Sequence, residues 1–141
     1  MGLLEAHAGL AGKVAVVVGG AGEIIGRAVT LGLAKAGVSI ATCDIHEDAV
    51  AAIVPEVEAL GVRILSVRAD AGDPRALDTF YDEVEAGFGA IDVVVNVVGG
   101  VKRCLFMNTT REDNTRDIRL NYGYVVDSCQ RAIPLIRKGG K

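Results

Sequence analysis

The stretch V-A-V-V-V-G-G-A-G-E-I-I-G-R-A, residues 14–28, decides the fold. Its first five residues are small or β-branched and apolar, which is typical of a strand buried on both faces of a parallel sheet. A cluster of glycines interrupts this run, and apolar residues then recur at helical spacing from residue 24 to residue 36. A strand, a glycine-rich turn and a helix in this order predict a β-α unit whose turn approaches a phosphate group closely.

The same alternation continues along the chain. Predicted strands cover residues 13–18, 38–43, 62–67 and 91–95. Predicted helices cover residues 24–36, 47–60, 74–88 and 109 or 110 to 137, and the last one bends at Pro134 and stops at Gly139-Gly140. Strands and helices that alternate with short links require right-handed crossovers. We therefore expect one α/β domain over residues 1–141, a Rossmann-like doubly wound parallel sheet of about four strands with helices on both faces.

Charge, hydropathy and cysteine spacing indicate which classes of partner and which cellular compartment to expect. The net charge of −3 provides no electrostatic reason to bind nucleic acid or an anionic membrane. The arginines after residue 110 alternate with acidic residues, which is typical of a solvated helix surface. No apolar run is long enough for a signal peptide or a membrane span, so we expect a cytoplasmic protein. Cys43, Cys104 and Cys129 follow no C-x-x-C spacing, which predicts three reduced thiols, mostly buried, and no metal site.

The glycine turn has the chemistry of a dinucleotide site. A pyrophosphate requires a tight chain reversal, a backbone without side chains at the point of approach, and a helix whose first N–H groups face the charge. We therefore predict that Gly20, Gly22, Ile25 and Gly26 bind the cofactor. A tight turn with a purely structural role is the alternative.

Asp44 predicts which dinucleotide is bound. It ends the second predicted strand, 24 residues after Gly20, close to the offset of roughly 20 residues at which a carboxylate meets the adenosine ribose. A carboxylate there accepts hydrogen bonds from the ribose hydroxyls and repels a 2′-phosphate. Glu23 adds a second negative charge in the turn, so NAD is preferred over NADP. In the alternative interpretation, Asp44 caps the next helix and Glu23 is solvated.

The motifs of the chain resemble the short-chain dehydrogenase/reductase family from residue 10 to residue 140. V-G-G-A-G-E-I-I-G-R-A (18–28) resembles the T-G-x-x-x-G-x-G of that family, and R-A-D-A-G-D (68–73) resembles its adenine-contacting motif. V-N-V-V-G-G (95–100) stands in the place of N-N-A-G, and L-N-Y-G (120–123) resembles V-N-x-x-G. The resemblance implies cofactor contacts from Asp70, Ala71, Asn96 and Gly99, a catalytic role for Asn121, strand order 3-2-1-4, and hydride transfer between an alcohol and a ketone with NAD(P).

The chain departs from the family pattern in two parts of the site. Ile24 replaces the middle glycine, where a β-branched side chain crowds the approach to the pyrophosphate, and Gly22 supplies conformational freedom instead. Val97-Val98 replaces Asn-Ala beneath the nicotinamide.

The catalytic residues of the family are also missing. None of the three tyrosines is followed by a lysine four residues later, and the chain ends where the family continues to its Ser and Tyr-x-x-x-Lys. Of the catalytic tetrad only Asn121 remains, and its structural alternative is a polar residue that loosens a helix. The domain is therefore predicted to be incomplete at its C-terminus and inactive alone.

Two functions follow from these features. In the first, the chain is a truncated short-chain oxidoreductase. In the second, it is a non-catalytic nucleotide-binding or self-associating module. An unrelated Rossmann protein such as a methyltransferase leaves Asp70, Asn96 and Asn121 unexplained. In the family sheet order, residues 91–98 form an apolar edge strand, and the helix from residue 109 loses a neighbour, so we expect a homo-oligomer or a complementary fragment at this surface.

Overall fold

The computed structural model describes residues 9–22 and 24–137. Its strands are β1 (Val14–Val18), β2 (Ser39–Asp44), β3 (Ile64–Arg68) and β4 (Val93–Asn96). Its α-helices are α2 (Ile25–Lys35), α3 (Glu47–Glu58), α4 (Pro74–Phe88), α5 (Arg111–Ile118) and α6 (Tyr124–Ala132). Three short helices complete the fold: the 3-10 helices η1 (Phe106–Asn108) and η3 (Ile133–Leu135), and the π-helix η2 (Arg119–Gly123).

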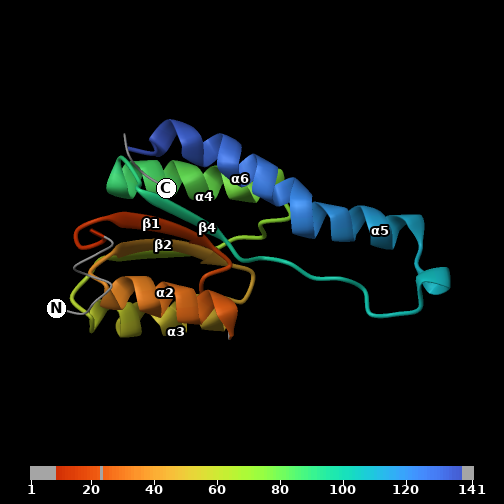
Figure 1. Cartoon of the computed structure of the whole chain (residues 1–141), viewed down its shortest axis with the longest axis horizontal. Helices are drawn as coiled ribbons and strands as arrows, with labels where there is room; N and C mark the ends of the chain where they lie inside the picture. Colours follow the sequence, from red (N-terminus) through yellow and green to blue (C-terminus); the bar gives the residue numbers. More distant parts are fainter. Residues whose placement is uncertain (1–8, 23, 138–141) are drawn as a thin grey trace.

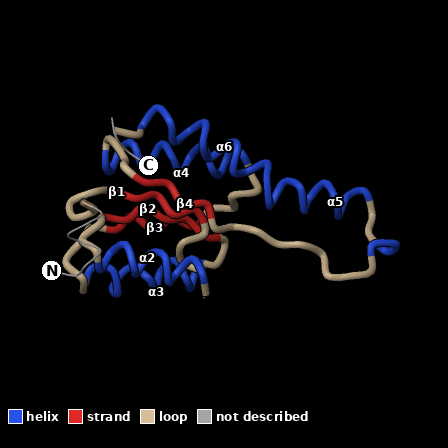
Figure 2. Tube along the Cα trace, viewed as in Figure 1, coloured by secondary structure: helices blue, strands red, loops and turns tan. Residues whose placement is uncertain are grey.

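The four strands form one parallel sheet in the order β3-β2-β1-β4, which confirms the predicted fold and strand order. Helices α2 and α3 cover one face of the sheet, and α4 and α6 cover the other (Figures 1 and 2). Every residue of β1 is buried, as expected for a central strand covered on both faces. The carboxyl ends of the strands therefore lie together at one end of the sheet, where ligands bind in open α/β folds.

The α2 helix packs through small residues. Gly26, Thr30 and Ala34 are its buried row, whereas Ile25 is 66% exposed. Thr30 Oγ1 donates a hydrogen bond of 2.8 Å to the carbonyl oxygen of Gly20, which ties the helix to the turn after β1. Because small side chains allow a helix and a strand to approach closely, this row brings the first turn of α2 against the glycine turn.

The last helical segment differs from its prediction. It begins as expected, with Thr110 and Asp113 forming a capping box at the start of α5. However, the π-helix η2 separates α5 from α6, and the chain has left the helix before residue 137. Pro134 has no N–H group to continue the α-helical pattern, so α6 ends at residue 132 and a 3-10 turn follows. The predicted stop at Gly139-Gly140 lies outside the described residues.

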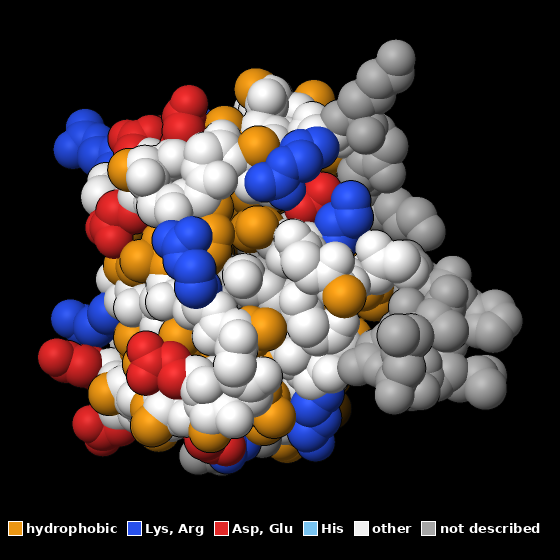
Figure 3. Space-filling view, turned by 90° about the vertical axis from the view of Figure 1, so that its left-hand side faces the viewer, with side chains coloured by type: hydrophobic (Ala, Val, Ile, Leu, Met, Phe, Trp, Pro, Cys, Tyr) orange, Lys and Arg blue, Asp and Glu red, His pale blue; other side chains and the backbone are white. Residues whose placement is uncertain are grey.

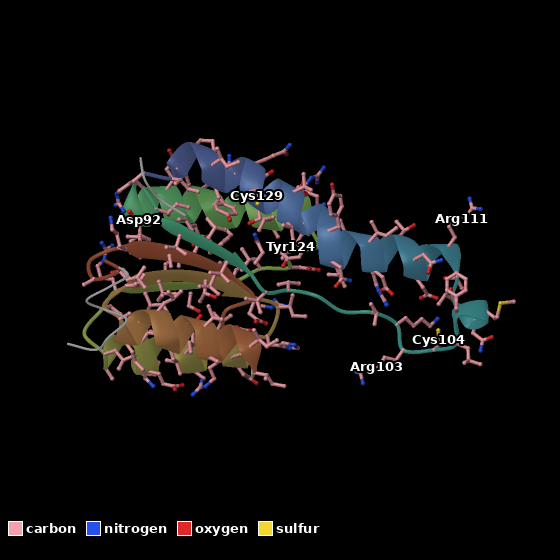
Figure 4. The ribbon with its side chains drawn as sticks, in the orientation of Figure 1. Asp92, Arg103, Cys104, Arg111, Tyr124 and Cys129 are labelled. Atoms are coloured by element: carbon pink, nitrogen blue, oxygen red, sulfur yellow. The ribbon has the colours of Figure 1, made fainter. Side chains whose placement is uncertain are left out.

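Residue 136 pairs with the edge strand instead of continuing the helix. Ile136 forms an isolated parallel bridge with Ile91, and the N–H of Arg137 donates to the carbonyl oxygen of Ile91 at 2.9 Å. The predicted open edge is thus covered at its beginning, next to the buried Asp92. Asp92 Oδ2 accepts the N–H of Val14 at 2.9 Å and also pairs with Arg137. The side chain of Asp92 lies at the amino end of β4, at the opposite end of the sheet from the carboxyl ends (Figure 4).

Two expectations about side-chain environment are tested by the structure. All three cysteines are free thiols, but only Cys43 is buried, and Cys104 is exposed on the loop before α5, so the prediction that they are mostly buried is wrong. Four of the arginines after residue 110 form ion pairs with aspartates, among them Arg119 with Asp127. On the face that carries the amino ends of the strands, positive and negative side chains are interspersed (Figure 3).

Candidate functional site

A cleft of about 780 Å³ opens at the carboxyl ends of the four strands. Its volume is in the range of small-molecule and cofactor sites. Predicted cofactor-binding residues that line it are Gly22, Ile25, Gly26, Asp44, Asp70, Ala71 and Gly99. The remaining lining residues are Gly19, Ile24, Cys43, Ile45, His46, Asp48, Ala49, Ala69, Val97, Val98 and Leu120. The fold therefore brings together, at the ends of all four strands, residues that separate sequence motifs had indicated.

The glycine turn leaves no space for side chains between β1 and α2. Gly19 has a φ of +85°, a conformation that favours glycine, and its N–H donates to the carbonyl oxygen of Cys43 at 2.8 Å. A Cβ atom on Gly26 would lie only 1.9 Å from the carbonyl oxygen of Gly19. These two glycines place the first turn of α2 directly on the turn after β1, so that the cleft has a backbone floor.

The amino end of α2 presents donors to this floor. An α-helix leaves the N–H groups of its first turn without partners inside the helix, and the helix dipole adds positive potential there. The first turn of α2 contains no acidic residue, and its N-cap residue, Ile24, makes no side-chain capping bond. The amides of Ile25 and Gly26 therefore suit an anionic group such as a pyrophosphate. Glu23 lies outside the described residues.

Gly20, a predicted cofactor-binding residue, lies behind the cleft lining. Gly20 is buried and does not line the cleft, because its Cα faces Thr30 and Thr42 rather than the open space. A Cβ atom there would lie 2.4 Å from Thr42 Oγ1 and 2.6 Å from Thr30 Oγ1. Gly20 is thus required for close packing of α2 on the sheet, and this packing positions the turn that lines the cleft.

Asp44 holds a carboxylate at the rim of the cleft. The residue is 9% exposed at the end of β2, and its Oδ1 accepts the N–H of His46 at 3.2 Å. Its Oδ2 lies 3.3 Å from where a Cβ atom on Gly22 would stand, which places it beside the glycine turn. The N-cap of α3 is His46, so the alternative in which Asp44 caps that helix is wrong.

The loop after β3 forms the neighbouring wall. Asp70 Oδ1 accepts the N–H of Gly72 at 2.7 Å, which fixes the turn into α4. Ala71 is 3% exposed and contributes an apolar surface to the cleft. Arg119 Nε donates to the carbonyl oxygen of Gly72 at 3.0 Å and so connects this wall to the π-helix η2. Leu120 enters the cleft lining from the same π-helix.

The loop after β4 is held by Asn121. Its Nδ2 donates to the carbonyl oxygens of Gly100 at 2.6 Å and Asp117 at 2.7 Å, and its Oδ1 accepts the N–H of Gly100 at 3.2 Å. The side chain does not line the cleft. It therefore supports the loop that carries Gly99, from its place within the π-helix η2.

Asn96 does not line the cleft, but it has an unsatisfied group at the end of β4. Its Oδ1 atom is buried, and within the described ranges of the chain it has no hydrogen-bond partner. Most buried polar atoms in native proteins are paired, so such an atom suits a site that a polar ligand group or a water completes. The residue set that lines the cleft, with the glycine turn, the first turn of α2 and the carboxylate of Asp44, fits a dinucleotide.

Tyr81 and Tyr124 lie outside the cleft, and burial raises the pKa of both hydroxyls. Burial raises the pKa of Tyr81 to about 12, although its hydroxyl lies 2.7 Å from Ser128 Oγ. Burial also raises the pKa of Tyr124 to about 12, and its hydroxyl donates to the carbonyl oxygen of Val98 at 2.8 Å. The thiol of Cys43 is likewise buried, which raises its pKa to about 12 and keeps it protonated.

Metal and membrane features are not found in the described part of the chain. Over residues 9–22 and 24–137, no three His, Cys, Asp or Glu side chains are grouped as a metal site would require. Over the same ranges, no helix combines the length and the apolar character needed to cross a bilayer.

Comparison with known proteins agrees with this geometry. Residues 13–141 match the sequence profile described as short chain dehydrogenase. The chain belongs to this family. Relatives of the family include the probable oxidoreductase EphD of Mycobacterium tuberculosis strain H37Rv, 34% identical over 122 residues, which are 86% of this chain and 21% of that protein.

Solved structures of the short-chain dehydrogenase family have the same fold. A short-chain dehydrogenase/reductase from Serratia marcescens superposes with a TM-score of 0.88 at 30% identity, covering 93% of this chain and 54% of the other. A blue fluorescent protein from a metagenomic library, solved in complex with NADPH, superposes with a TM-score of 0.87 at 30% identity and the same coverage. The chain thus spans about half of these solved chains and a smaller part of the mycobacterial relative.

The sequence motifs missed several lining residues. Ile45 and His46 directly follow β2, and the rule that ligands bind beyond the carboxyl ends of parallel strands could have included them. Leu120 opens the L-N-Y-G motif, but that motif was used only for Asn121, and Leu120 reaches the cleft through a helical segment whose position depends on the packing of α6.

Proposed function

We propose that this chain binds NAD, in preference to NADP, as the cofactor-binding part of an oxidoreductase that acts on an alcohol or a ketone. The observation that carries this proposal is Asp44, a nearly buried carboxylate at the end of β2 beside Gly22. Its Oδ2 accepts hydrogen bonds from ribose hydroxyls, whereas a 2′-phosphate at the same place meets a like charge. When bound, the dinucleotide supplies the hydride donor or acceptor of the family reaction.

Each part of the cleft contributes to binding in a different way. Asp70 and Ala71 line the adenosine end, and Gly22 with the amides of Ile25 and Gly26 holds the pyrophosphate. Gly99 lines the nicotinamide end of the cleft, and Asn96, which lies just before the lining residues at the end of β4, is buried behind it.

Asn121 is a positioning residue in this proposal. Its three hydrogen bonds to Gly100 and Asp117 hold the loop after β4 in place, and the side chain does not enter the cleft. It acts on the cofactor through the position of Gly99, which lies next to the bonded Gly100.

Hydride transfer by the 141 residues alone is not expected. A phenol that donates or accepts a proton near pH 7 must have its pKa lowered from about 10 by a nearby cation. In Tyr81 and Tyr124 burial moves the pKa in the opposite direction. Binding without turnover is therefore the predicted behaviour of this chain.

We also infer that the chain is cytoplasmic and that it associates with a second copy or a complementary fragment. The three free thiols support a reducing compartment. The partial cover of β4 supports association, since Ile136 pairs with only the beginning of the edge.

Two measurements test the proposed function. Isothermal titration with NAD should give saturable binding, and a panel of secondary alcohols with NAD should give no NADH absorbance. Saturable binding should persist, weakened, in Asn121→Ala, because that residue acts through the loop. If the unchanged chain turns over an alcohol and Asn121→Ala abolishes that turnover, the prediction that the chain is inactive is refuted. If no binding is detected at millimolar NAD, the cofactor assignment is refuted.

A further inference from the structure

The π-helix η2 carries three consecutive residues that contact different parts of the cleft. Arg119 Nε donates to the carbonyl oxygen of Gly72, in the loop after β3, at 3.0 Å. Leu120 lines the cleft itself, and Asn121 holds Gly100 in the loop after β4. Figure 1 shows where α5 passes into α6, beside the loop that connects β3 to α4. Single π-helical turns are rare and often occur at functional sites, and this one joins the two walls of the cleft.

The guanidinium group of Arg119 is held from two sides. Its Nη2 atom lies 2.6 Å from Asp127 Oδ2 of α6, and 28% of the arginine side chain is exposed. A Cβ atom on Gly123 would lie 3.0 Å from Cδ and 3.0 Å from Nη1 of Arg119, so the arginine lies across the bare backbone of this glycine. The ion pair and the missing side chain together direct Nε of Arg119 toward the carbonyl oxygen of Gly72.

The loop that Arg119 holds carries the carboxylate of Asp70. Asp70 Oδ1 accepts the N–H of Gly72 at 2.7 Å, and the carbonyl oxygen of Asp70 accepts the N–H of Asp73 at 3.0 Å. A Cβ atom on Gly72 would lie 3.4 Å from Leu120 Cδ2, so η2 also limits the loop from this side. Because Gly72 is bonded both to Arg119 and to the carboxylate of Asp70, a shift of Gly72 moves that carboxylate.

We propose that Arg119 is a positioning residue that sets the preference of the cleft for adenine over hypoxanthine. The inference rests on the proposed function, in which Asp70 lies at the adenosine end of the bound dinucleotide. The 6-amino group of adenine donates a hydrogen bond to a carboxylate, whereas the 6-oxo group of hypoxanthine places an acceptor against it. Arg119 does not line the cleft. It acts through Gly72, which holds the carboxylate of Asp70 where this discrimination takes place.

The first test compares the affinity of the chain for NAD with its affinity for nicotinamide hypoxanthine dinucleotide. Calorimetric titration of the unchanged chain should give about tenfold tighter binding of NAD, which is the effect of one hydrogen bond to a charged group. Arg119→Met keeps an unbranched side chain and removes the guanidinium, and it should reduce this ratio to about threefold or less. A purely structural role of Arg119 would weaken both dinucleotides equally and leave the ratio unchanged.

Gly123→Ala tests the same contact without removing a charge. Its Cβ atom should displace the flexible arginine side chain, so the ratio of the two affinities should fall as it does in Arg119→Met. In the Arg119→Met background, Gly123→Ala should not change the ratio further, because both changes act through one contact. Arg116→Met is the matched control. It removes an exposed arginine that pairs with the adjacent Asp117 on α5, and it should leave the ratio unchanged.

The second test requires no ligand. Amide hydrogen exchange at Gly72 and Asp73, whose N–H groups donate to Asp70, should become faster in Arg119→Met because the loop loses its contact with η2. Unchanged exchange at both amides, or a ratio of affinities that Arg119→Met and Gly123→Ala leave intact, would overturn the proposal. An unchanged chain that binds neither dinucleotide would refute the proposed function, whereas one that binds both with equal affinity would refute only the preference for adenine.

Discussion

The substitution Gly26→Ala tests whether the close approach of α2 to β1 builds the cofactor floor. The added Cβ would lie 1.9 Å from the carbonyl oxygen of Gly19 and 3.0 Å from its carbonyl carbon. An ordinary carbon–oxygen contact is about 3.3 Å, so the helix start must move by about 1.4 Å. Both contacts are with backbone, and a change of rotamer cannot relieve them.

The expected cost combines two opposing effects. Overpacking of a close contact costs about 1–3 kcal/mol, and a backbone clash places this one near the upper end. Replacing glycine by alanine inside a helix returns about 1 kcal/mol. We therefore expect Gly26→Ala to lower the free energy of unfolding by about 2 kcal/mol. The displaced amides of α2 should weaken NAD binding by about tenfold or more, which corresponds to about 1.4 kcal/mol.

Gly32→Ala is the matched control, because it makes the same chemical change in the same helix. A Cβ on Gly32 would meet no heavy atom within 4 Å in the described part of the chain beyond its own helix and neighbours. It should therefore raise the free energy of unfolding by up to about 1 kcal/mol and leave NAD affinity unchanged. Urea unfolding and calorimetric titration of both variants measure these effects. Equal stability of the two variants would refute the close-approach argument.

Three further substitutions test other parts of the fold and the site. Burial alone would raise the pKa of Asp92, but the N–H of Val14 and the nearby cations outweigh it and lower the pKa. The stabilisation by the ionised carboxylate is complete above the unfolded pKa of about 3.9 and is lost as the pH falls through the folded pKa. Asp92→Asn should therefore lower the free energy of unfolding in urea by less near pH 3 than near pH 7. An equal loss at both pH values would count against this role of Asp92. Tyr81→Phe should cost about 1–3 kcal/mol in thermal unfolding because it leaves the buried hydroxyl of Ser128 without its partner, and adding Ser128→Ala should cost less than the sum of the two single changes. Ile24→Gly should strengthen NAD binding in calorimetry by opening the approach to the turn, and unchanged affinity would show that this exposed side chain does not crowd it.

Local patterns were sufficient to predict the order of the elements. The β-branched run of β1, the proline and aspartate at the start of α4, and the capping box of Thr110 and Asp113 each act within a few residues, so the sequence carries them directly. Which residues of α2 are buried could not be predicted from a local pattern. Apolar spacing marks a helix, but the small residues Gly26 and Thr30 became buried only because the helix packs closely on β1.

Contacts between distant segments were the part that could not be predicted. Asn121 was assigned from its motif, yet its hydrogen bonds go to the loop after β4, which no local pattern specifies. The pairing of Ile136 with Ile91 depends on the position of a helix end relative to a strand 45 residues earlier. Leu120 reaches the cleft for the same reason, through the packing of a helix that is distant in sequence.

The ratio of NAD to NADP affinity, compared between the unchanged chain and Asp44→Asn, tests the central claim most directly. Asparagine retains an oxygen for the N–H of His46 and removes only the negative charge. The unchanged chain should bind NAD more tightly than NADP, and Asp44→Asn should reduce that preference by about tenfold or more. Glu85→Gln is the control, because it removes a carboxylate from α4 away from the cleft, and it should leave the preference unchanged. Equal affinity of the unchanged chain for the two dinucleotides, or a preference that Asp44→Asn leaves intact, would contradict the assignment of Asp44 as the selecting residue.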